Sequence, residues 1–166
     1  MILPDLLEKG LKLVICGTAP GNISAAAGAY YAAKGNLFYP TLAQCGFTPV
    51  ELEPGQYPEL LKYGIGLTDL VKYTFGLDSS LKADDYDIEG FERKIFKYNP
   101  KVVCFNSKTA AKAYLKCKST GDVKLGLQKS TIGKSKIYVA PSTSPQAKVY
   151  WDLSYWQMLK RIVEKG

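Results

Sequence analysis

The stretch from residue 11 to residue 24 constrains the fold of this chain more than any other. An apolar, β-rich run at 13–16 stops at Gly17 and enters a loop with Pro20 and Gly21, before small, helix-compatible residues follow. This pattern is typical of a strand that passes through a tight turn into a helix. In open α/β sheets, ligands bind beyond the carboxyl ends of strands, where backbone N–H groups face them. We therefore expect the functional site at this loop.

Strands and helices alternate along the rest of the chain, which implies a mostly parallel sheet covered on both faces. We expect a three-layer α/β/α fold with four or five strands, in a single domain over residues 1–166. Residues 72–86 are expected to form a surface loop, and the basic segment 118–134 at most one short strand. The predicted strands are 13–16, 64–71, 102–105 and 136–139, and the predicted helices are 4–10, 37–45, 56–63, 87–98, 108–116 and 153–164.

The absence of histidine is the sharpest exclusion that the composition offers. It rules out Ser-His-Asp and Cys-His catalysis and histidine metal sites, so acid–base chemistry falls to carboxylates, lysine, tyrosine or backbone groups. Four cysteines are scattered without a CxxC pair, which argues against zinc or iron–sulfur ligands and against a disulfide framework. We expect reduced thiols, three of them buried, among Cys16, Cys45, Cys104 and Cys117.

The chain is basic, with a net charge of +7 and an isoelectric point near 9.1. Such a charge suits a polyanionic partner, because each phosphate neutralised by lysine or arginine releases counterions. An ordinary solvated basic surface gives the same charge, so that alternative stays open. The apolar runs are too short to cross a membrane, and residues 1–5 lack the features of a signal peptide. We expect a cytoplasmic protein, and a monomer.

Polar residues follow several of the predicted strands. Asp69 lies near the end of the second strand, and residues 140–145 follow the last one. The carboxyl ends of parallel strands meet at one edge of a sheet, so one cleft would collect these residues and the loop at 17–24.

Four short motifs stand in order along the chain: CGTAPG at 16–21 with Ser24, GNLFY at 35–39, GIGLTDLV at 64–71 and APS at 140–142. In their order and spacing they resemble the mismatch-specific uracil and thymine DNA glycosylase family. The resemblance implies a three-layer α/β/α enzyme that flips a damaged or mispaired base out of duplex DNA. Such an enzyme hydrolyses the N-glycosidic bond of that base, without metal or cofactor.

The sequence departs from the family at the positions that usually hold the attacking water and the wedge. Ala19 stands where the family has an asparagine, and Ala140 where it has asparagine or methionine. Thr143 and Ser144 replace the usual wedge residues, often Gly-Leu. A weak wedge predicts a preference for mismatched or single-stranded substrates, where extruding a base costs less.

Glycosidic cleavage requires that charge leaving on the base be stabilised and that a water be placed at the sugar. Backbone N–H groups around residues 18–22 can donate to a base carbonyl. Tyr31 matches the family position of an aromatic that stacks on the base, and Asn36 could help to hold the pocket. Asn22 could bind the water, or could simply form the turn beside Gly21. The base-binding candidates are Gly17, Thr18, Ala19, Asn22, Tyr31 and Asn36.

Asp69 is the candidate catalytic residue, because a carboxylate there can accept a proton from water and stabilise the sugar cation. Its alternative role is to cap the next turn or to pair with a lysine. Ser24 could equally be a helix-start hydroxyl, and residues 142–144 an ordinary Pro-Ser turn. The candidate DNA contacts are Ser24, Ser142, Thr143, Ser144 and Lys148.

The leading hypothesis is a monofunctional glycosylase that excises uracil, most often opposite guanine. The alternative is a protein of the same fold that binds lesions or mismatches without cutting, because both family asparagines are absent. An Asp69 directed into the pocket favours the enzyme, and one salt-bridged outside favours the binder. A nucleotide- or phosphate-binding protein is a weaker third hypothesis, because the sequence has neither GxxxxGK[ST] nor GxGxxG.

Overall fold

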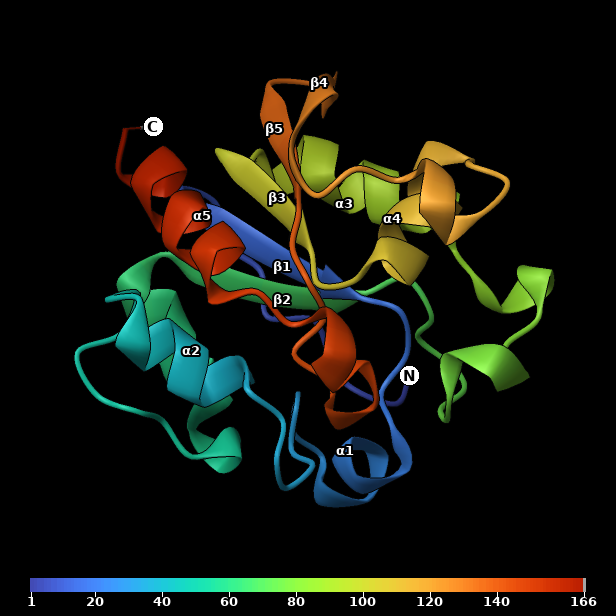
Figure 1. Cartoon of the computed structure of the whole chain (residues 1–166), viewed down its shortest axis with the longest axis horizontal. Coiled ribbons are helices and arrows are strands. Elements are labelled where there is room, and N and C mark those ends of the chain that lie inside the picture. Colours follow the sequence, from blue (N-terminus) through green and yellow to red (C-terminus); the bar gives the residue numbers. More distant parts are fainter. Residues whose placement is uncertain (166) are drawn as a thin grey trace.

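A five-stranded sheet in the order β2-β1-β3-β5-β4 organises the computed structural model, which describes residues 1–165 (Figure 1). The last residue of the predicted domain, 166, lies outside the described residues. Four strands run parallel, and β4 pairs antiparallel with β5 at the edge, so the predicted mostly parallel sheet is confirmed. The strands are β1 (Leu13–Gly17), β2 (Ile65–Asp69), β3 (Val102–Phe105), β4 (Gly126–Ile132) and β5 (Ser135–Val139).

Helices cover both faces of this sheet, which confirms the three-layer arrangement (Figure 1). Helices α2 and α5 and the 3₁₀ helix η1 pack on one face, and α3 and α4 pack on the other. The short α1 follows the glycine loop after β1. The helices are α1 (Asn22–Ala27), α2 (Phe38–Gln44), η1 (Pro54–Tyr63), α3 (Ile88–Tyr98), α4 (Lys108–Leu115) and α5 (Leu153–Lys165).

Successive side chains of each buried strand point alternately into the two hydrophobic cores, one on each face of the sheet. In β1, Leu13 and Ile15 face the core under α2 and α5, while Val14 and Cys16 face the core under α3 and α4. Successive side chains of a strand point to opposite faces, so a strand buried on both faces is apolar throughout. Full burial of each such side chain is worth about 1.5–3 kcal/mol.

The predicted helix at 4–10 is wrong. This segment is not helical: Leu6 forms an antiparallel bridge with Leu67, each backbone N–H donating to the other carbonyl at 2.9 Å, and residues 9–10 form a turn. The bridge satisfies the otherwise unpaired outer edge of β2. Gly66 permits the approach, because a Cβ there would lie 2.5 Å from the Leu6 carbonyl oxygen.

Other predictions need smaller corrections. The helix expected at 56–63 is 3₁₀ rather than α, in keeping with Pro58 inside it, which has no N–H to donate. The segment 118–134 supplies the fifth strand, and residues 72–86 contain two short 3₁₀ turns, η2 (Asp78–Ser80) and η3 (Ala83–Asp85). Of the cysteines, only Cys16 and Cys104 are fully buried, rather than three.

Ser107 caps α4 and Asp87 caps α3, with their side chains accepting from the N–H groups of Ala110 and Gly90. Among residues 1–165, the structure has no helix of the length and apolarity that a membrane span requires.

Candidate functional site

A cavity of about 600 Å³ opens where β1, β2, β3 and β5 end. The chain leaves β1 toward β2 and leaves β3 toward β5, so the carboxyl ends of β1 and β3 form a topological switch point. Ligands of open α/β folds bind at such points. The predicted cleft is therefore confirmed, although Ala140 is buried in the core beneath it. The predicted site residues that line it are Gly17, Thr18, Ala19, Asn22, Ser24, Tyr31, Asn36, Asp69, Ser142, Thr143 and Ser144.

Asp69 ends β2 directly opposite Gly17 in the parallel register. Its side chain lines the cavity and is only 5% exposed. Within residues 1–165, the carboxylate makes no hydrogen bond and no ion pair, so it neither caps a turn nor pairs with a lysine. A buried carboxylate without partners is costly, and such groups cluster at functional sites.

Gly17 leaves room for the Asp69 carboxylate. A Cβ on Gly17 would lie 2.8 Å from Asp69 Oδ1 and 3.3 Å from the Tyr31 hydroxyl. The backbone around the pair is fixed, because the N–H groups of Leu70 and Val71 donate to the carbonyls of Gly17 and Thr18. Position 17 therefore requires glycine, because the Asp69 carboxylate approaches its Cα so closely.

Burial raises the pKa of Asp69 to about 7, because desolvation disfavours the charged form. The positive charge of Lys72 acts against this rise, and the negative charge of Asp5 adds to it. A carboxylate with a pKa near neutrality is suited to act as a general base.

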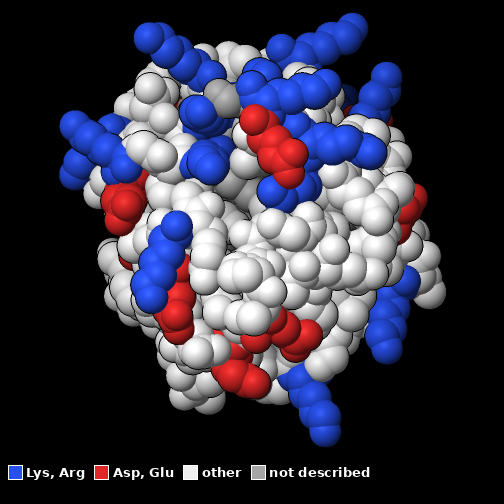
Figure 2. All heavy atoms as spheres, turned by 90° about the vertical axis from the view of Figure 1, so that its left-hand side faces the viewer, with Lys and Arg blue, Asp and Glu red and all other residues white. Residues whose placement is uncertain are grey.

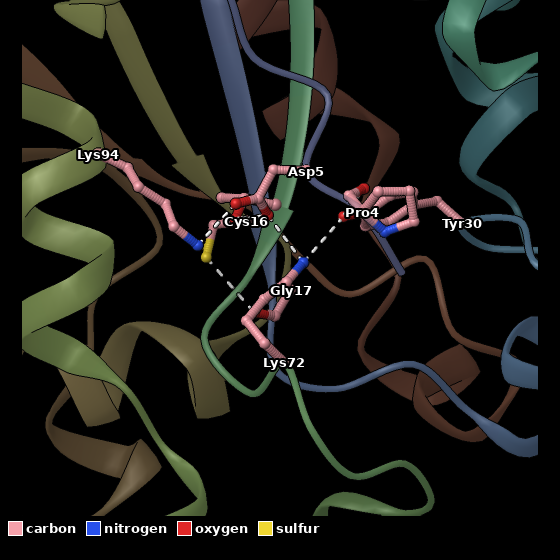
Figure 3. A network of polar contacts seen from close by, with 8 residues as sticks. Pro4, Asp5, Cys16, Gly17, Tyr30, Lys72 and Lys94 are labelled. Carbon is pink, nitrogen blue, oxygen red and sulfur yellow. Dashed lines mark hydrogen bonds and ion pairs between the residues drawn. The ribbon is translucent and has the colours of Figure 1, made fainter. Parts of the chain in front are cut away.

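Lys72 belongs to a buried polar network next to this site (Figure 3). Its ammonium group pairs with Asp5 at 2.7 Å and donates to the Tyr30 hydroxyl at 3.2 Å. Asp5 also pairs with Lys94 at 2.6 Å and accepts a hydrogen bond from Thr68 at 2.7 Å. Burial raises the pKa of Asp5, but the hydrogen bonds from Lys72, Lys94 and Thr68 and the charge of Lys72 together keep it below its ordinary value. The network thus fixes one ionised lysine close to Asp69.

Tyr31 forms another wall of the cavity. Its backbone is left-handed, with φ of 55°, which is rare for a bulky residue and occurs where the surrounding structure enforces it. The ring stacks on Phe38 with centroids 4.1 Å apart. The buried hydroxyl has no hydrogen-bond partner among residues 1–165, and burial and the charge of Asp69 raise its pKa well above the ordinary value. This hydroxyl therefore remains a neutral donor.

The glycine loop presents unpaired backbone donors. No acceptor in the described chain takes the N–H groups of Ala19, Asn22 and Ile23. Pro20 fixes the loop from the other side, since its carbonyl accepts from Gly76 N–H at 2.9 Å. These donors are available to a ligand carbonyl in the cavity.

Asn106 is a site residue that the sequence reasoning missed. It follows β3 directly, is 4% exposed and lines the cavity between the loops after β1 and β5. Its amide donates to the Thr143 hydroxyl at 3.0 Å and accepts from Thr143 N–H at 3.2 Å. Its place at a strand end, the same criterion that singled out Asp69, could have identified it.

The other predicted contact residues differ in exposure. Thr143 is 1% exposed, and Lys148 is exposed but does not line the cavity. The hydroxyls of Ser142 and Ser144 accept from backbone N–H groups within the turn. Ser24 is buried, and its hydroxyl accepts from Ala32 N–H at 3.0 Å, which supports the loop that carries the left-handed tyrosine.

The loop after β2 closes the far wall. Leu77, Asp78 and Ser79 line the cavity, and the Asp78 carboxylate accepts a hydrogen bond from the Thr18 hydroxyl. Asn36, half-buried on the near wall, accepts from Phe38 N–H at 3.0 Å. No three side chains of the metal-binding types converge anywhere in residues 1–165.

Comparisons with known proteins agree with this arrangement. A solution NMR structure of a Methanosarcina acetivorans protein, described as a candidate uracil DNA glycosylase, matches with a TM-score of 0.67 and 21% identity. The match covers 98% of this chain and 96% of that chain, and at this identity it shows the fold. The family model of the uracil DNA glycosylase superfamily matches residues 4–164. Because that match spans nearly the whole sequence, the chain belongs to the uracil DNA glycosylase superfamily.

Proposed function

We propose that this protein is a monofunctional DNA glycosylase that excises uracil by hydrolysing the N-glycosidic bond, with Asp69 activating the attacking water. One observation carries the proposal. The Asp69 carboxylate lines the cavity without a partner among residues 1–165, and its pKa is about 7. Such a group is free to take a proton from water at neutral pH.

The cavity supports each step of this reaction. A flipped base lies against Tyr31, and the N–H groups of Ala19 and Asn22 donate to its carbonyl oxygen. As the bond between the sugar C1′ and the base nitrogen breaks, its electron pair leaves with the base. The ionised Asp69 stabilises the oxocarbenium-like sugar. Water then forms a bond to C1′ and gives its proton to the carboxylate.

The substrate we propose is uracil in a G:U mismatch or in single-stranded DNA. Thr143 and Ser144, which stand at the family's wedge positions, are small and polar, and the first of them is buried. Without an apolar wedge in this turn, substrates that are already poorly paired are favoured, since they cost less to flip.

The alternative, a lesion binder that does not cut, rests on the absence of both family asparagines. A carboxylate inside the cavity that pairs with no residue of the described chain, 1–165, favours the enzyme, because a binder of anionic DNA gains nothing from such a negative charge there.

A panel of labelled oligonucleotides tests the proposal. It carries uracil, thymine, hypoxanthine or xanthine in single strands and opposite each base, and alkaline cleavage reveals abasic sites. We expect abasic product from uracil, fastest in single strands and G:U pairs. Binding to these lesions without any abasic product would establish the binder instead, and equal turnover on a stable matched pair would contradict the proposed preference.

A further inference from the structure

Within residues 1–165, the lining of the cavity carries no positive side chain. No lysine or arginine lines the cavity in the described residues, whereas Asp69 and Asp78 do. The lysines and arginines behind the net charge of +7 lie outside this lining. A surface that attracts phosphate by charge lies elsewhere on the molecule.

Lysines and arginines gather at the opposite end of the sheet, where the strands begin. Figure 2 views the molecule from that side, and its upper half is crowded with basic side chains, while its lower half is largely white with scattered acidic and basic side chains. We call this surface the basic end, and define it by the exposed residues Lys12, Lys97, Lys134, Lys136 and Arg161.

Several elements bring these residues together. Lys12 immediately precedes β1, and Lys136 pairs with Val102 at the start of β3. The turn before β5 packs against the end of α3, because a Cβ on Gly133 would touch the Phe96 ring at 2.8 Å. The hydrogen bond from Lys160 and the charges of Lys160 and Lys12 lower the pKa of Glu164, so the start of β1 lies near the end of α5.

Most ammonium groups of the basic end are not neutralised by ion pairs with acidic side chains. Glu164 lies among them, but its carboxylate pairs with Lys160 at 2.7 Å. Within residues 1–165, Lys12, Lys134 and Lys136 form no ion pair. The negative ends of helix dipoles explain lysines in last helical turns, such as Lys97, but not those at the starts of strands.

The basic end and the cavity face opposite ways. They lie at the two ends of the same strands, and five residues of β1 separate them by about 15 Å. A duplex seated over the cavity covers the carboxyl edge of the sheet and leaves the basic end open. Contact with both surfaces therefore requires two segments of DNA.

We propose that the basic end binds the phosphate backbone of a second segment of double-stranded DNA, without reading its sequence. The identification of the partner as DNA, rather than another polyanion, rests on the proposed function. Such a surface holds the protein on DNA while the cavity samples bases, because electrostatic contacts permit sliding and transfer between segments.

The test compares two triple variants with the same change in net charge. Lys12→Gln, Lys134→Gln and Lys136→Gln neutralise the basic end, and the control neutralises Lys116, Lys118 and Lys124, which are exposed around the end of α4. Fluorescence anisotropy measures the Kd for an unmodified 20-base-pair duplex at several salt concentrations. Excision is measured in parallel on a 10-nucleotide single strand containing uracil.

We expect the basic-end variant to bind the plain duplex at least about tenfold more weakly, with the slope of log K against log salt reduced by roughly two to three. The control variant should change Kd less than about twofold, and both should excise uracil from the short strand at the wild-type rate. An equal loss in both variants, or no loss in the basic-end variant, would overturn the proposal. A wild-type protein that excises nothing would contradict the proposed function. The comparison of duplex binding between the two variants would still test the role of the basic end.

Discussion

At the scale of single residues, Asp69 is buried and has no side-chain partner among residues 1–165, a combination that destabilises the folded state when the carboxylate is ionised. Its folded pKa, about 7, lies above its ordinary value of 3.8. Between these values the folded protein keeps a proton that the unfolded chain has lost. The contribution of this group to stability therefore falls as pH rises through that window.

Asp69→Asn should remove this cost. We expect the variant to be more stable than the wild type by about 2–4 kcal/mol above pH 7, with the difference vanishing below about pH 4. Chemical denaturation across this pH range measures it, with the exposed Asp84→Asn as the control. A difference that is the same at every pH would show that the carboxylate is not buried as described.

The charge of Lys72 should set the pH at which the site works. With Asp69 as base, kcat/KM on single-stranded uracil rises with pH to half its maximum near pH 7. Lys72→Gln removes a charge that lowers this pKa, so the midpoint should move up by about one pH unit, with activity recovering at pH 9. Lys94→Gln removes a positive charge that lowers the pKa of Asp69 less than Lys72 does, so the midpoint should move less. Midpoints that stay in place in both variants would exclude this tuning.

Gly17→Ala should displace the carboxylate. The added methyl would lie 2.8 Å from Asp69 Oδ1, so the side chain must move, and we expect single-turnover excision to fall at least about tenfold. Gly55→Ala is the matched control and should keep wild-type rates, because a Cβ there would have no atom of residues 1–165 within 4 Å. An alanine variant of Gly17 that excises normally would show that the position of the carboxylate is not critical.

The sequence predicted the strand-end position of Asp69 but not its surroundings. The ion pair between Lys72 and Asp5 joins residues that only the pairing of segment 4–10 with β2 brings together, and this segment was predicted to be helical. Asn106 was missed because it belongs to none of the family motifs. The left-handed backbone of Tyr31 has no local signal, since glycine or asparagine usually occupies such positions.

At the scale of elements, the loop after β2 offers an apolar side chain that the turn at 142–144 lacks. Leu77 lines the cavity and is 60% exposed, and Gly76 N–H, bound to the Pro20 carbonyl, holds the loop beside the glycine loop. Leu77→Ala should slow single-turnover excision about fivefold or more in G:U duplexes but not in single strands. Only in a duplex does the flipped nucleotide leave a gap in the base stack for the Leu77 side chain to fill. The control is Leu127→Ala on the distant β4 edge, and equal slowing on both substrates would assign Leu77 to the pocket itself.

Elements with strong apolar periodicity were predicted correctly, and those decided by distant contacts were not. Strands β1, β3 and β5 are short apolar runs, and α3 and α5 carry apolar stripes, so local pattern suffices for them. Residues 4–10 have leucines that suit a helix, but they pair with β2 because that edge of the sheet is otherwise open.

At the scale of the whole molecule, charge and cavity are separated. Alternating strands and helices predicted the sheet and the edge where the cavity lies, because the carboxyl ends of parallel strands converge. Net charge predicted a polyanionic partner, but it carries no information on where the lysines gather. Only the structure places them at the end of the sheet away from the cavity (Figure 2).

The central claim is that Asp69 activates water in a uracil-excising site. Single-turnover excision of uracil from a single strand and from a G:U duplex, by wild type and by folded Asp69→Asn at pH 8, tests it most directly. We expect the wild type to produce abasic sites and the variant to be slower by about 10²–10⁴-fold on both substrates, with binding retained. A variant that excises at close to the wild-type rate would contradict the claim.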